Sequence, residues 1–226
     1  MEHKEAEILW GPEGQPISAR FDDPYFSLDD GLAETRHVFL EGNALRDRLQ
    51  SGFHIAELGF GTGLNLLATV QLAERLKTRG RIRFTSFEAF PMQPAEIRRA
   101  MNAFPDLAGC AQEMMSHLDQ GTYAFALGPI DAEIILGDAR TTLTGWPGYA
   151  DAWFLDGFSP AKNPELWSPE MMRMVADRTK AGGTFATYTA AGEVRRALET
   201  AGFAVERIPG FGRKRHMTRG KKVGPR

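Results

Sequence analysis

The sequence predicts an α/β fold built on a mostly parallel β-sheet. Short apolar runs alternate along the chain with segments whose apolar residues recur at helical spacing. The 226 residues, 42% of them hydrophobic, are enough for one domain with its own core. Strands that alternate with helices form a parallel sheet covered on both faces.

The first half of the chain contains two predicted strands, each followed by a helix. "FHIAEL" (53–58) is the first strand, and "LNLLATVQLAERL" (64–76) has the apolar spacing of a helix. "RIRFTSFE" (81–88) is the second strand. "PAEIRRAMNAF" (94–104) begins with Pro, which is favoured in the first turn of a helix.

The second half repeats this alternation and ends in two strands. Its predicted segments are, in order, strands 132–138 and 151–157, helix 168–180, strand 182–189, helix 192–202, and a closing strand pair in "FAVERIPG" and "RKRHMTRGK". Ser168 stands before Pro and Glu as a helix N-cap. Ligands bind beyond the carboxyl ends of the strands in such sheets, so the residues just after each strand are the candidates.

Composition excludes several classes of protein. No apolar run approaches the roughly 18–20 residues needed to span a bilayer, and "MEHKEAEILW" does not read as a signal peptide. The single cysteine, Cys110, excludes an intrachain disulfide framework, and the five histidines lack metal-ligand spacing. We therefore expect a cytoplasmic protein with no metal and no membrane contact.

The charge of the chain is unevenly distributed. Residues 211–226 carry seven Lys or Arg and no acid, whereas the whole chain has a net charge of −2, so the other residues sum to −9. A basic end on an acidic body suggests contact with a polyanion. A solvated chain end explains the charge pattern equally well.

The glycine-rich stretch "ELGFGTGLNLL", Glu57 to Leu67, joins the first strand to the first helix. A P-loop requires Gly-Lys-Ser/Thr, but Leu64 and Asn65 follow the last glycine. A dinucleotide fingerprint requires its third glycine one position later, at Leu64. The spacing E-x-G-x-G-x-G resembles instead the first motif of Rossmann-like class I S-adenosylmethionine-dependent methyltransferases. That resemblance implies a seven-stranded sheet with a C-terminal antiparallel hairpin.

Three carboxylates stand where such a donor would need them. Glu57 either favours the cationic end of the donor or orders the loop. Glu88 ends the second strand and is expected to accept the ribose hydroxyls, and Asp138 the adenine amino group. A surface acid or a helix cap is the alternative for Glu88 and Asp138. The full expected donor set is Glu57, Gly59, Phe60, Gly61, Thr62, Gly63, Asn65, Glu88, Asp138, Ala139 and Asn43.

The stretch "DAWFLDGFSPAKNPELW" (151–167) indicates the acceptor side. Asp156 ends the fourth strand, where a carboxylate can orient an amine or take its proton, and the sequence leaves both roles open. Phe158 is expected to wall a planar base. The other expected substrate residues are Pro160, Lys162, Asn163, Tyr25 and Arg36.

This stretch resembles the signature of the methyltransferase domain of the bifunctional tRNA 5-methylaminomethyl-2-thiouridine biosynthesis proteins, MnmC. Two further stretches, 21–45 and 187–217, are similar to the same family. The resemblance implies methyl transfer from S-adenosylmethionine to the primary amine of 5-aminomethyl-2-thiouridine at the tRNA wobble position. It also implies donor binding at 57–63, Glu88 and Asp138, and an active-site role for Asp156.

The family resemblance sets the expected organisation and partners. We expect an N-terminal extension (1–50), a methyltransferase domain (51–217) and a flexible basic tail (218–226). The bifunctional proteins carry an FAD-dependent oxidase, for which this sequence has no second glycine fingerprint, so we expect a stand-alone methyltransferase without FAD and a separate oxidase as partner. Arg213, Lys214 and Arg215 are the expected contacts to the phosphates of the tRNA anticodon arm.

Three alternatives remain at this point. Within the same fold, the acceptor is another amine, on a small molecule or a protein. In other classes, the chain is an NAD-dependent oxidoreductase, which the spacing of the third glycine disfavours, or a non-catalytic RNA-binding module.

Overall fold

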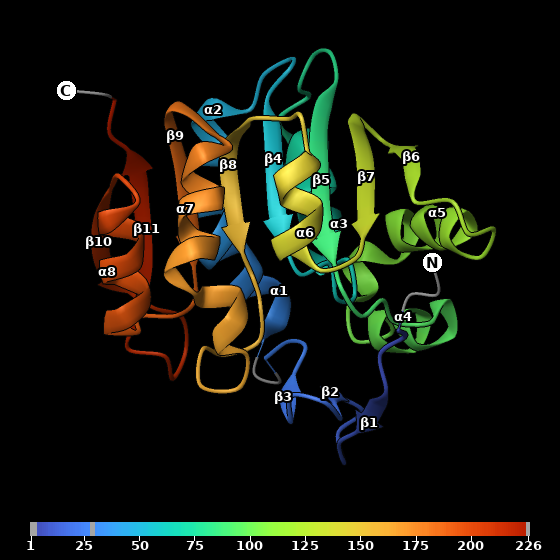
Figure 1. The fold of residues 1–226 in the computed structure, drawn as a ribbon. Coiled ribbons are helices and arrows are strands. Elements are labelled where there is room, and N and C mark those ends of the chain that lie inside the picture. The colour runs from blue at the N-terminus through green and yellow to red at the C-terminus, as the bar shows by residue number, and fades with distance from the viewer. Residues whose placement is uncertain (1–3, 28–29, 225–226) are drawn as a thin grey trace.

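The computed structural model describes residues 4–27 and 30–224 of the chain. Its central sheet contains the strands β4 (His54–Leu58), β5 (Ile82–Glu88), β6 (Ala124–Leu127), β7 (Ile130–Leu136), β8 (Ala150–Leu155), β9 (Thr179–Thr187), β10 (Phe203–Pro209) and β11 (His216–Lys222). Their spatial order is β10-β11-β9-β8-β4-β5-β7-β6, as Figure 1 shows. The five strands from β9 to β7 are parallel, whereas β11, β10 and β6 pair antiparallel at the two edges.

Helices cover both faces of this sheet. They are α1 (Gly31–Thr35), α2 (Leu45–Arg48), α3 (Leu64–Arg75), α4 (Pro94–Met101), α5 (Ala108–Leu118), α6 (Ala139–Gly145), α7 (Pro169–Asp177) and α8 (Gly192–Thr200), with short π or 3-10 segments η1 (Arg36–Glu41), η2 (Pro105–Leu107) and η3 (Pro164–Trp167). In Figure 1, α6, α7 and α8 lie in front of the sheet, and α1, α2 and α3 lie behind it.

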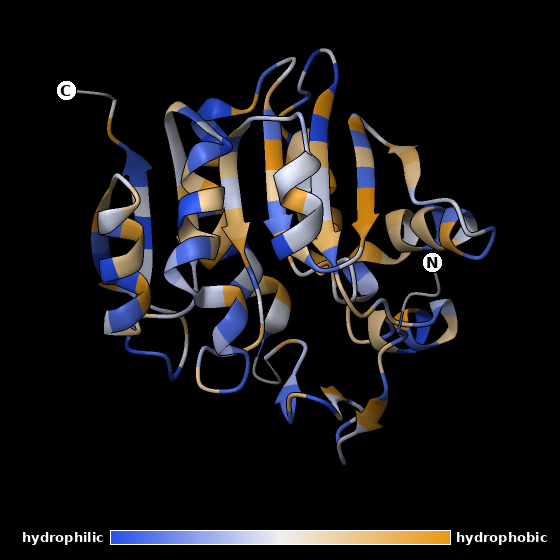
Figure 2. Cartoon of the chain, viewed as in Figure 1, coloured by the Kyte–Doolittle hydropathy of each residue, from blue (hydrophilic) through white to orange (hydrophobic). Residues whose placement is uncertain are grey.

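The core lies between these layers. Apolar residues run through the central strands, interrupted by polar bands on β4, β5 and β7, and polar residues are frequent on the helices (Figure 2). Trp153, Phe154 and Phe185 are completely buried on β8 and β9. Burial on both faces explains why these strands read as continuous apolar runs in the sequence rather than as alternating ones.

A second, small sheet lies below the carboxyl ends of the parallel strands. It consists of β1 (Ile8–Trp10), β2 (Pro16–Ser18) and β3 (Asp23–Pro24), all antiparallel. Trp10 attaches this sheet to α4, because its Nε1–H donates to Glu96 Oε2 at 2.8 Å and its ring lies 3.9 Å from the guanidinium of Arg99. The small sheet therefore closes the edge at which ligands bind in parallel folds.

The α/β fold class with a mostly parallel sheet is confirmed, with two corrections. The central sheet has eight strands and not seven, because β6 adds an antiparallel strand at one edge. The expected flexible tail from residue 218 is wrong for residues 218–222, which lie in β11 and pair with β10 and β9. Alternating buried positions, Thr218 and Gly220, fix this segment in the sheet despite its charge. Residues 225–226 lie outside the described residues.

The expected N-terminal extension (1–50) packs into the main core over its helical part. Leu32, Val38 and Leu45 belong to the same buried cluster as Ile55 of β4 and Phe154 of β8. The first 50 residues thus contribute both a small sheet and part of the central core.

Candidate active site

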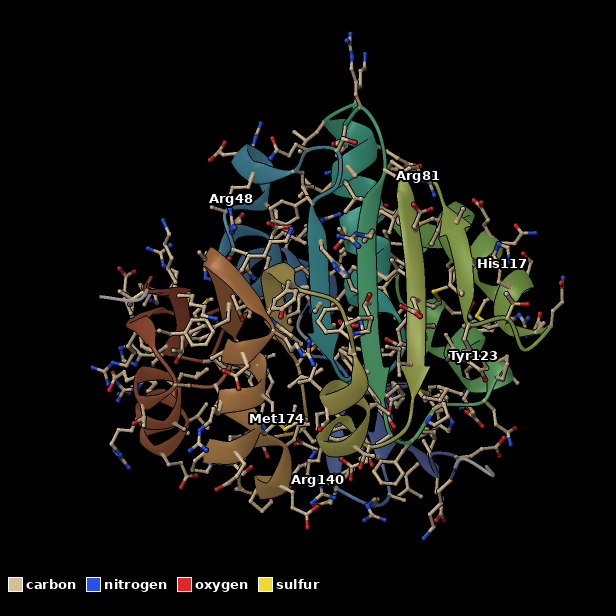
Figure 3. The ribbon with its side chains drawn as sticks, turned by 45° about the horizontal axis from the view of Figure 1, so that its top comes forward. Arg48, Arg81, His117, Tyr123, Arg140 and Met174 are labelled. Atoms are coloured by element: carbon tan, nitrogen blue, oxygen red, sulfur yellow. The ribbon has the colours of Figure 1, made fainter. Side chains whose placement is uncertain are left out.

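One cavity of about 520 Å³ lies at the carboxyl ends of the parallel strands. The glycine loop after β4, the ends of β5, β7 and β8, and the N-terminal segment from the small sheet to α1 line it, together with Tyr188 after β9 and Lys214 between β10 and β11. Arg140, labelled in Figure 3, lies at this edge of the sheet, whereas Arg48 lies at the opposite edge.

The glycine loop takes a conformation that requires glycine. Gly59, Gly61 and Gly63 all have positive φ, at +90°, +53° and +79°. A Cβ atom on Gly59 would lie 2.5 Å from the backbone oxygen of Asp156, and one on Gly61 would lie 3.1 Å from the Tyr25 ring. The loop is therefore held against the end of β8 on one side and the N-terminal segment on the other.

Asn65, in the first turn of α3, joins two carboxylates. Its Nδ2 group donates to Glu57 Oε1 at 2.8 Å and to Asp156 Oδ2 at 2.6 Å. Ser86 Oγ donates to the second oxygen of Glu57 at 2.6 Å. Two carboxylate oxygens need donors here, which fixes the orientation of the amide. Asn65 Oδ1 is buried and has no hydrogen-bond partner among the described residues, so an acceptor atom remains free beside the cavity.

Near neutral pH, the Asp156 carboxyl group lies close to the midpoint between its protonated and ionised forms. Burial raises the pKa of Asp156 to about 7, while the hydrogen bond from Asn65 and the charge of Lys214 lower it and Glu34 raises it. A group with this pKa takes up and releases protons close to neutral pH, which suits general-base chemistry. Tyr188 fixes the backbone beside it, because its hydroxyl donates to the carbonyl oxygen of Gly157 at 2.7 Å.

Glu57 and Glu88 are also buried acids. Burial raises the pKa of both carboxyl groups above their ordinary values. Glu88 Oε2 accepts from the Gly61 N–H at 2.9 Å, and Glu88 Oε1 from the Phe90 N–H at 2.8 Å. With Asp156, three acids thus gather around the glycine loop. The hydrogen bonds described above come to them from amide, hydroxyl and backbone groups and not from cations. Such a cluster favours a cationic ligand.

Asp138 caps the N-terminus of α6. Its side chain accepts from the Arg140 N–H at 2.9 Å and also pairs with the Arg140 guanidinium. The hydrogen bond from Arg140 lowers the pKa of Asp138. Arg140 also lies 3.2 Å from Glu165. The helix-cap alternative for Asp138 is therefore present in the structure, while Asp138 and Ala139 both line the cavity as the donor reading requires.

The N-terminal segment roofs the cavity with aromatic rings. Phe21 stacks on Phe158 with centroids 4.8 Å apart, and Tyr25 meets Phe158 edge-on at 5.0 Å. Asp23 Oδ2 accepts from the Ser159 N–H at 2.8 Å, which ties this roof to the segment after β8. One face of Phe158, expected to wall a base, is thus covered by Phe21.

Most of the expected donor and substrate residues do reach the cavity. Those that line it are Gly59, Phe60, Gly61, Thr62, Asn65, Glu88, Asp138, Ala139, Asp156, Phe158, Asn163 and Tyr25. Glu57 lies behind the loop, and Gly63 precedes the first residue of α3. That placement of Glu57 favours the loop-ordering alternative over direct contact with a ligand.

Several expected residues have other surroundings. Asn43 is a correction, because its buried side chain donates to the carbonyl oxygens of Phe39 and Trp153 and does not line the cavity. Arg36 is a second correction, since its guanidinium donates to Gln71 Oε1 at 2.6 Å on α3. Asn43 and Arg36 thus hydrogen-bond to backbone carbonyl groups and to a residue on the surface of α3, and the spacing of residues in the sequence does not reveal these partners.

The remaining expected substrate residues lie at the rim. Lys162 hydrogen-bonds to the backbone oxygen of Asp22 and lies 3.7 Å from Asp23 Oδ1, so it secures the roof. Pro160 neighbours Ser159 and does not line the cavity. Of the expected phosphate contacts, Arg213 and Arg215 are exposed, whereas Lys214 lines the cavity.

Among the cavity residues that sequence reasoning missed are Glu34, Phe21 and Tyr188. Each lies far in sequence from the glycine loop and reaches the site only through tertiary packing. Phe21 and Glu34 fall within the stretch 21–45, whose similarity to a known family is the signal that pointed to this segment.

No cluster of three His, Cys, Asp or Glu side chains suited to a metal occurs within residues 4–27 and 30–224. Over the same residues, none of the helices has the length and apolar character required to cross a bilayer.

Comparison with known proteins connects this geometry to a family. A family profile described as S-adenosyl-L-methionine-dependent methyltransferase matches residues 106–223. The bifunctional tRNA 5-methylaminomethyl-2-thiouridine biosynthesis protein MnmC of Pseudomonas aeruginosa is 45% identical over 231 residues, covering 97% of this chain and 35% of that protein. The MnmC of Leptospira borgpetersenii is 44% identical and covers 95% of this chain and 34% of its own length. The chain thus spans about a third of these relatives.

Solved structures agree with the fold. The crystal structure of MNMC2 from Aquifex aeolicus matches with a TM-score of 0.74 and 26% identity, over 100% of this chain and 74% of that one. Spermidine synthase from Thermotoga maritima, with a TM-score of 0.58 and 12% identity over 99% of this chain and 72% of that one, shares the fold.

Proposed function

The chain belongs to the S-adenosyl-L-methionine-dependent methyltransferase family, and from that premise we propose that it is a tRNA wobble-uridine N-methyltransferase. The reaction transfers a methyl group from S-adenosyl-L-methionine to the primary amine of 5-aminomethyl(-2-thio)uridine in tRNA. Its product is 5-methylaminomethyl(-2-thio)uridine, the nucleoside in the names of the MnmC relatives.

The observation that carries this proposal is the position of Asp156. Its carboxyl group shares one cavity with the glycine loop and is held by Asn65 at 2.6 Å. A hydrogen-bonded carboxylate at the acceptor end of a donor pocket suits an amine nucleophile, because it accepts an N–H and leaves the nitrogen lone pair free. Phosphate-binding and NAD-binding loops have other glycine spacings, so the family and the loop favour the same donor.

The conformation of the glycine loop and the acids of the cavity suit S-adenosyl-L-methionine as the donor. When bound, this donor supplies an electrophilic methyl group on a sulfonium sulfur. The positive-φ glycines let the backbone come close to it, and the acids Glu88 and Asp156, which line the cavity, favour its positive charge. We assign Glu88 to the ribose hydroxyls, and Asp138 with Ala139 to the adenine.

In the proposed step, the amine nitrogen forms a bond to the methyl carbon as the carbon–sulfur bond breaks, and that electron pair stays on sulfur. The neutral amine is the reactive form, and the new secondary ammonium must lose a proton. Asp156, with its pKa raised to about 7, orients the amine and accepts a proton near neutral pH. Asn65 holds the carboxyl group in place throughout.

The remaining parts of the proposal concern the RNA. Sequence-specific RNA recognition usually reads an unstacked base in a pocket, and the Phe21–Phe158 pair lies at the acceptor side of this one. We assign Arg213 and Arg215 to the phosphates of the anticodon arm, with the cytoplasm as the compartment. We further propose that an FAD-dependent oxidase supplies the amine.

The test is methyl transfer in vitro to one tRNA prepared in two forms, with and without the 5-aminomethyl group on the wobble uridine. We expect labelled methyl groups only on the aminomethyl form, with 5-methylaminomethyluridine identified by nucleoside mass spectrometry. The Asp156→Asn variant is the control for adventitious activity. Transfer to both forms, or to neither while a small-molecule or protein amine is methylated, contradicts the tRNA assignment.

A second measurement uses cells. Nucleosides from cells that lack this protein are expected to accumulate 5-aminomethyl or 5-carboxymethylaminomethyl wobble uridines. Unchanged wobble uridines would contradict the proposal.

A further inference from the structure

One ion pair lines the cavity but has no part in the proposed step. Lys214 Nζ lies 2.7 Å from Glu34 Oε1. The two residues come from opposite ends of the chain: Glu34 from α1, and Lys214 from the loop between β10 and β11. The Glu34 side chain is 12% exposed and that of Lys214 is 48% exposed, so the acid is largely enclosed and the cation reaches it from the rim.

The loop that carries Lys214 has other anchors. His37 Nε2 lies 3.2 Å from the carbonyl oxygen of Pro209, and the His37 ring lies 6.0 Å from the Phe211 ring. The backbone N–H of Lys214 donates to the carbonyl oxygen of Phe211 at 3.0 Å. Removing the charge of Lys214 therefore leaves contacts that keep the loop in place.

The same ammonium lies over the aromatic ring beside the acceptor carboxylate. Lys214 Nζ is 4.4 Å from the centroid of the Tyr188 ring. The Tyr188 hydroxyl in turn donates to the carbonyl oxygen of Gly157, the residue after Asp156. Along one wall of the cavity, Lys214 thus contacts Tyr188, and Tyr188 contacts the backbone next to Asp156.

Charged and titratable groups face Asp156 from every element around it. The charge of Asp156 adds to burial in raising the pKa of Glu57 of β4, and burial raises the pKa of the Tyr188 phenol, so both groups stay neutral while Asp156 titrates. Asn65 of α3 is an uncharged donor. The remaining two groups are Lys214, whose charge favours the ionised form of Asp156, and Glu34, whose charge opposes it.

We propose that the Lys214–Glu34 pair is a positioning element of the acceptor site that sets the charge of Asp156 near neutral pH. Lys214 holds the carboxyl group in its ionised form, ready to receive a proton from the amine, and Glu34 limits that effect by partly neutralising Lys214. The inference rests on the proposed methyl transfer for its chemical meaning. It assigns Lys214 to the cavity rather than to a phosphate.

The decisive measurement is a titration that requires no RNA. Protein labelled with ¹³C at the aspartate carboxyl carbon is titrated by NMR, and the resonance lost in Asp156→Asn is assigned to Asp156. We expect the titration midpoint to move up in Lys214→Met and down in Glu34→Gln, each by roughly half a pH unit or more, because these changes remove opposite charges. Lys214→Arg is expected to retain the wild-type midpoint.

Opposite shifts distinguish an electrostatic role from a structural one. If the pair only holds the loop against α1, the two variants move the midpoint in the same direction or leave it at the wild-type value, and either result overturns the inference. Should Lys214→Met fail to fold, Glu34→Gln and Lys214→Arg still decide the question.

A second readout uses the pH profile of methyl transfer to aminomethyl-bearing tRNA. The acid limb of kcat/KM is expected to move to higher pH in Lys214→Met and to lower pH in Glu34→Gln. A uniform loss of rate at every pH contradicts the inference. Absence of transfer by the wild-type protein contradicts the proposed function instead, and the NMR titration then judges the ion pair alone.

Discussion

Strand β8 carries an aspartate at each end, and the two have opposite surroundings. Asp151, at the amino end, accepts from the Lys180 ammonium at 2.6 Å and from the His54 N–H at 2.8 Å. Asp156, just past the carboxyl end, accepts from a neutral amide and lies among other acids. Four residues lie between the two aspartates, so their Cα atoms are roughly 16 Å apart along the strand.

The contrast extends to the neighbours of each aspartate. Arg48, at the amino end, donates to the Asp151 carbonyl oxygen at 2.9 Å and to Thr184 at 2.6 Å, so charge and backbone are compensated there. At the carboxyl end, burial raises the pKa of Asp156 and Glu88. The acid at the amino end of the strand is paired with a cation, whereas the acids at the carboxyl end are buried, and a cationic ligand would stabilise their ionised forms.

The largest expected effect comes from exchanging each aspartate for asparagine. Asp156→Asn should lower the rate of methyl transfer by about 10²–10⁴-fold, the usual contribution of a general base, while S-adenosylhomocysteine still binds. Asp151→Asn should leave the rate per folded molecule within about twofold. Single-turnover rates and calorimetric donor titrations measure both. Equal losses of rate in the two variants would remove the functional distinction between the ends.

The second prediction concerns stability and pH. Because the pKa of Asp156 in the folded protein is raised to about 7 from 3.8, its contribution to the free energy of unfolding is present below pH 4 and is lost as the pH rises through about 7. Asp156→Asn, which cannot ionise, should therefore gain stability relative to the wild type, by about 2–4 kcal/mol, between pH 4 and pH 8.

Urea unfolding of both proteins at several pH values checks this prediction. Asp151→Asn is the matched control and should lose stability at neutral pH, because it gives up the pairing with Lys180. If the free energies of unfolding of the wild type and Asp156→Asn differed by the same amount at every pH, the pKa of Asp156 would not be raised in the folded protein.

The third prediction separates backbone strain from close approach. Gly59→Ala places a methyl group 2.5 Å from the Asp156 carbonyl oxygen at φ +90°, whereas Gly121→Ala has φ +68° and no neighbour within 4 Å. Both should lose about 1 kcal/mol through strain. Gly59→Ala should in addition weaken binding of S-adenosyl-L-methionine by about tenfold or more, measured by calorimetry. Equal donor affinity in both variants would show that the loop tolerates displacement from β8.

The smallest effect is expected at the exposed rim. Arg215→Ala should weaken tRNA binding a few-fold and reduce the slope of log K against log salt by about 0.7–0.9, since one phosphate contact is lost. Arg79→Ala, on the exposed loop before β5 at the other end of the sheet, should change neither. Filter binding at several salt concentrations measures both, and identical slopes in the two variants would argue against RNA docking at the carboxyl edge.

The sequence predicts the site residues that directly follow the parallel strands better than those that other segments contribute. Gly59, Glu88, Asp138 and Asp156 follow from one rule, that ligand residues stand directly after parallel strands. These positions depend on local order along the chain, which spacing reveals.

What the sequence leaves out depends on packing between distant segments. Glu34 and Lys214 are separated by most of the chain, and only the docking of α1 against the β10–β11 loop brings them together. Asn43 looks like a free amide before the first strand, yet its partners are the Phe39 and Trp153 carbonyl groups. Nothing in residue type or spacing distinguishes a buried structural amide from a ligand-binding one.

The Asn65 amide has a consequence for how this site can change over evolution. A primary amide nitrogen carries two hydrogens, and here Glu57 and Asp156 take one each. An aspartate at this position would have no amide hydrogens, and a serine or threonine would have only one. Either replacement would leave at least one of the two acids without its hydrogen-bond donor. Drift at any of these three positions is therefore constrained by the other two, and the glycine turn and the acceptor strand are expected to be inherited as a unit.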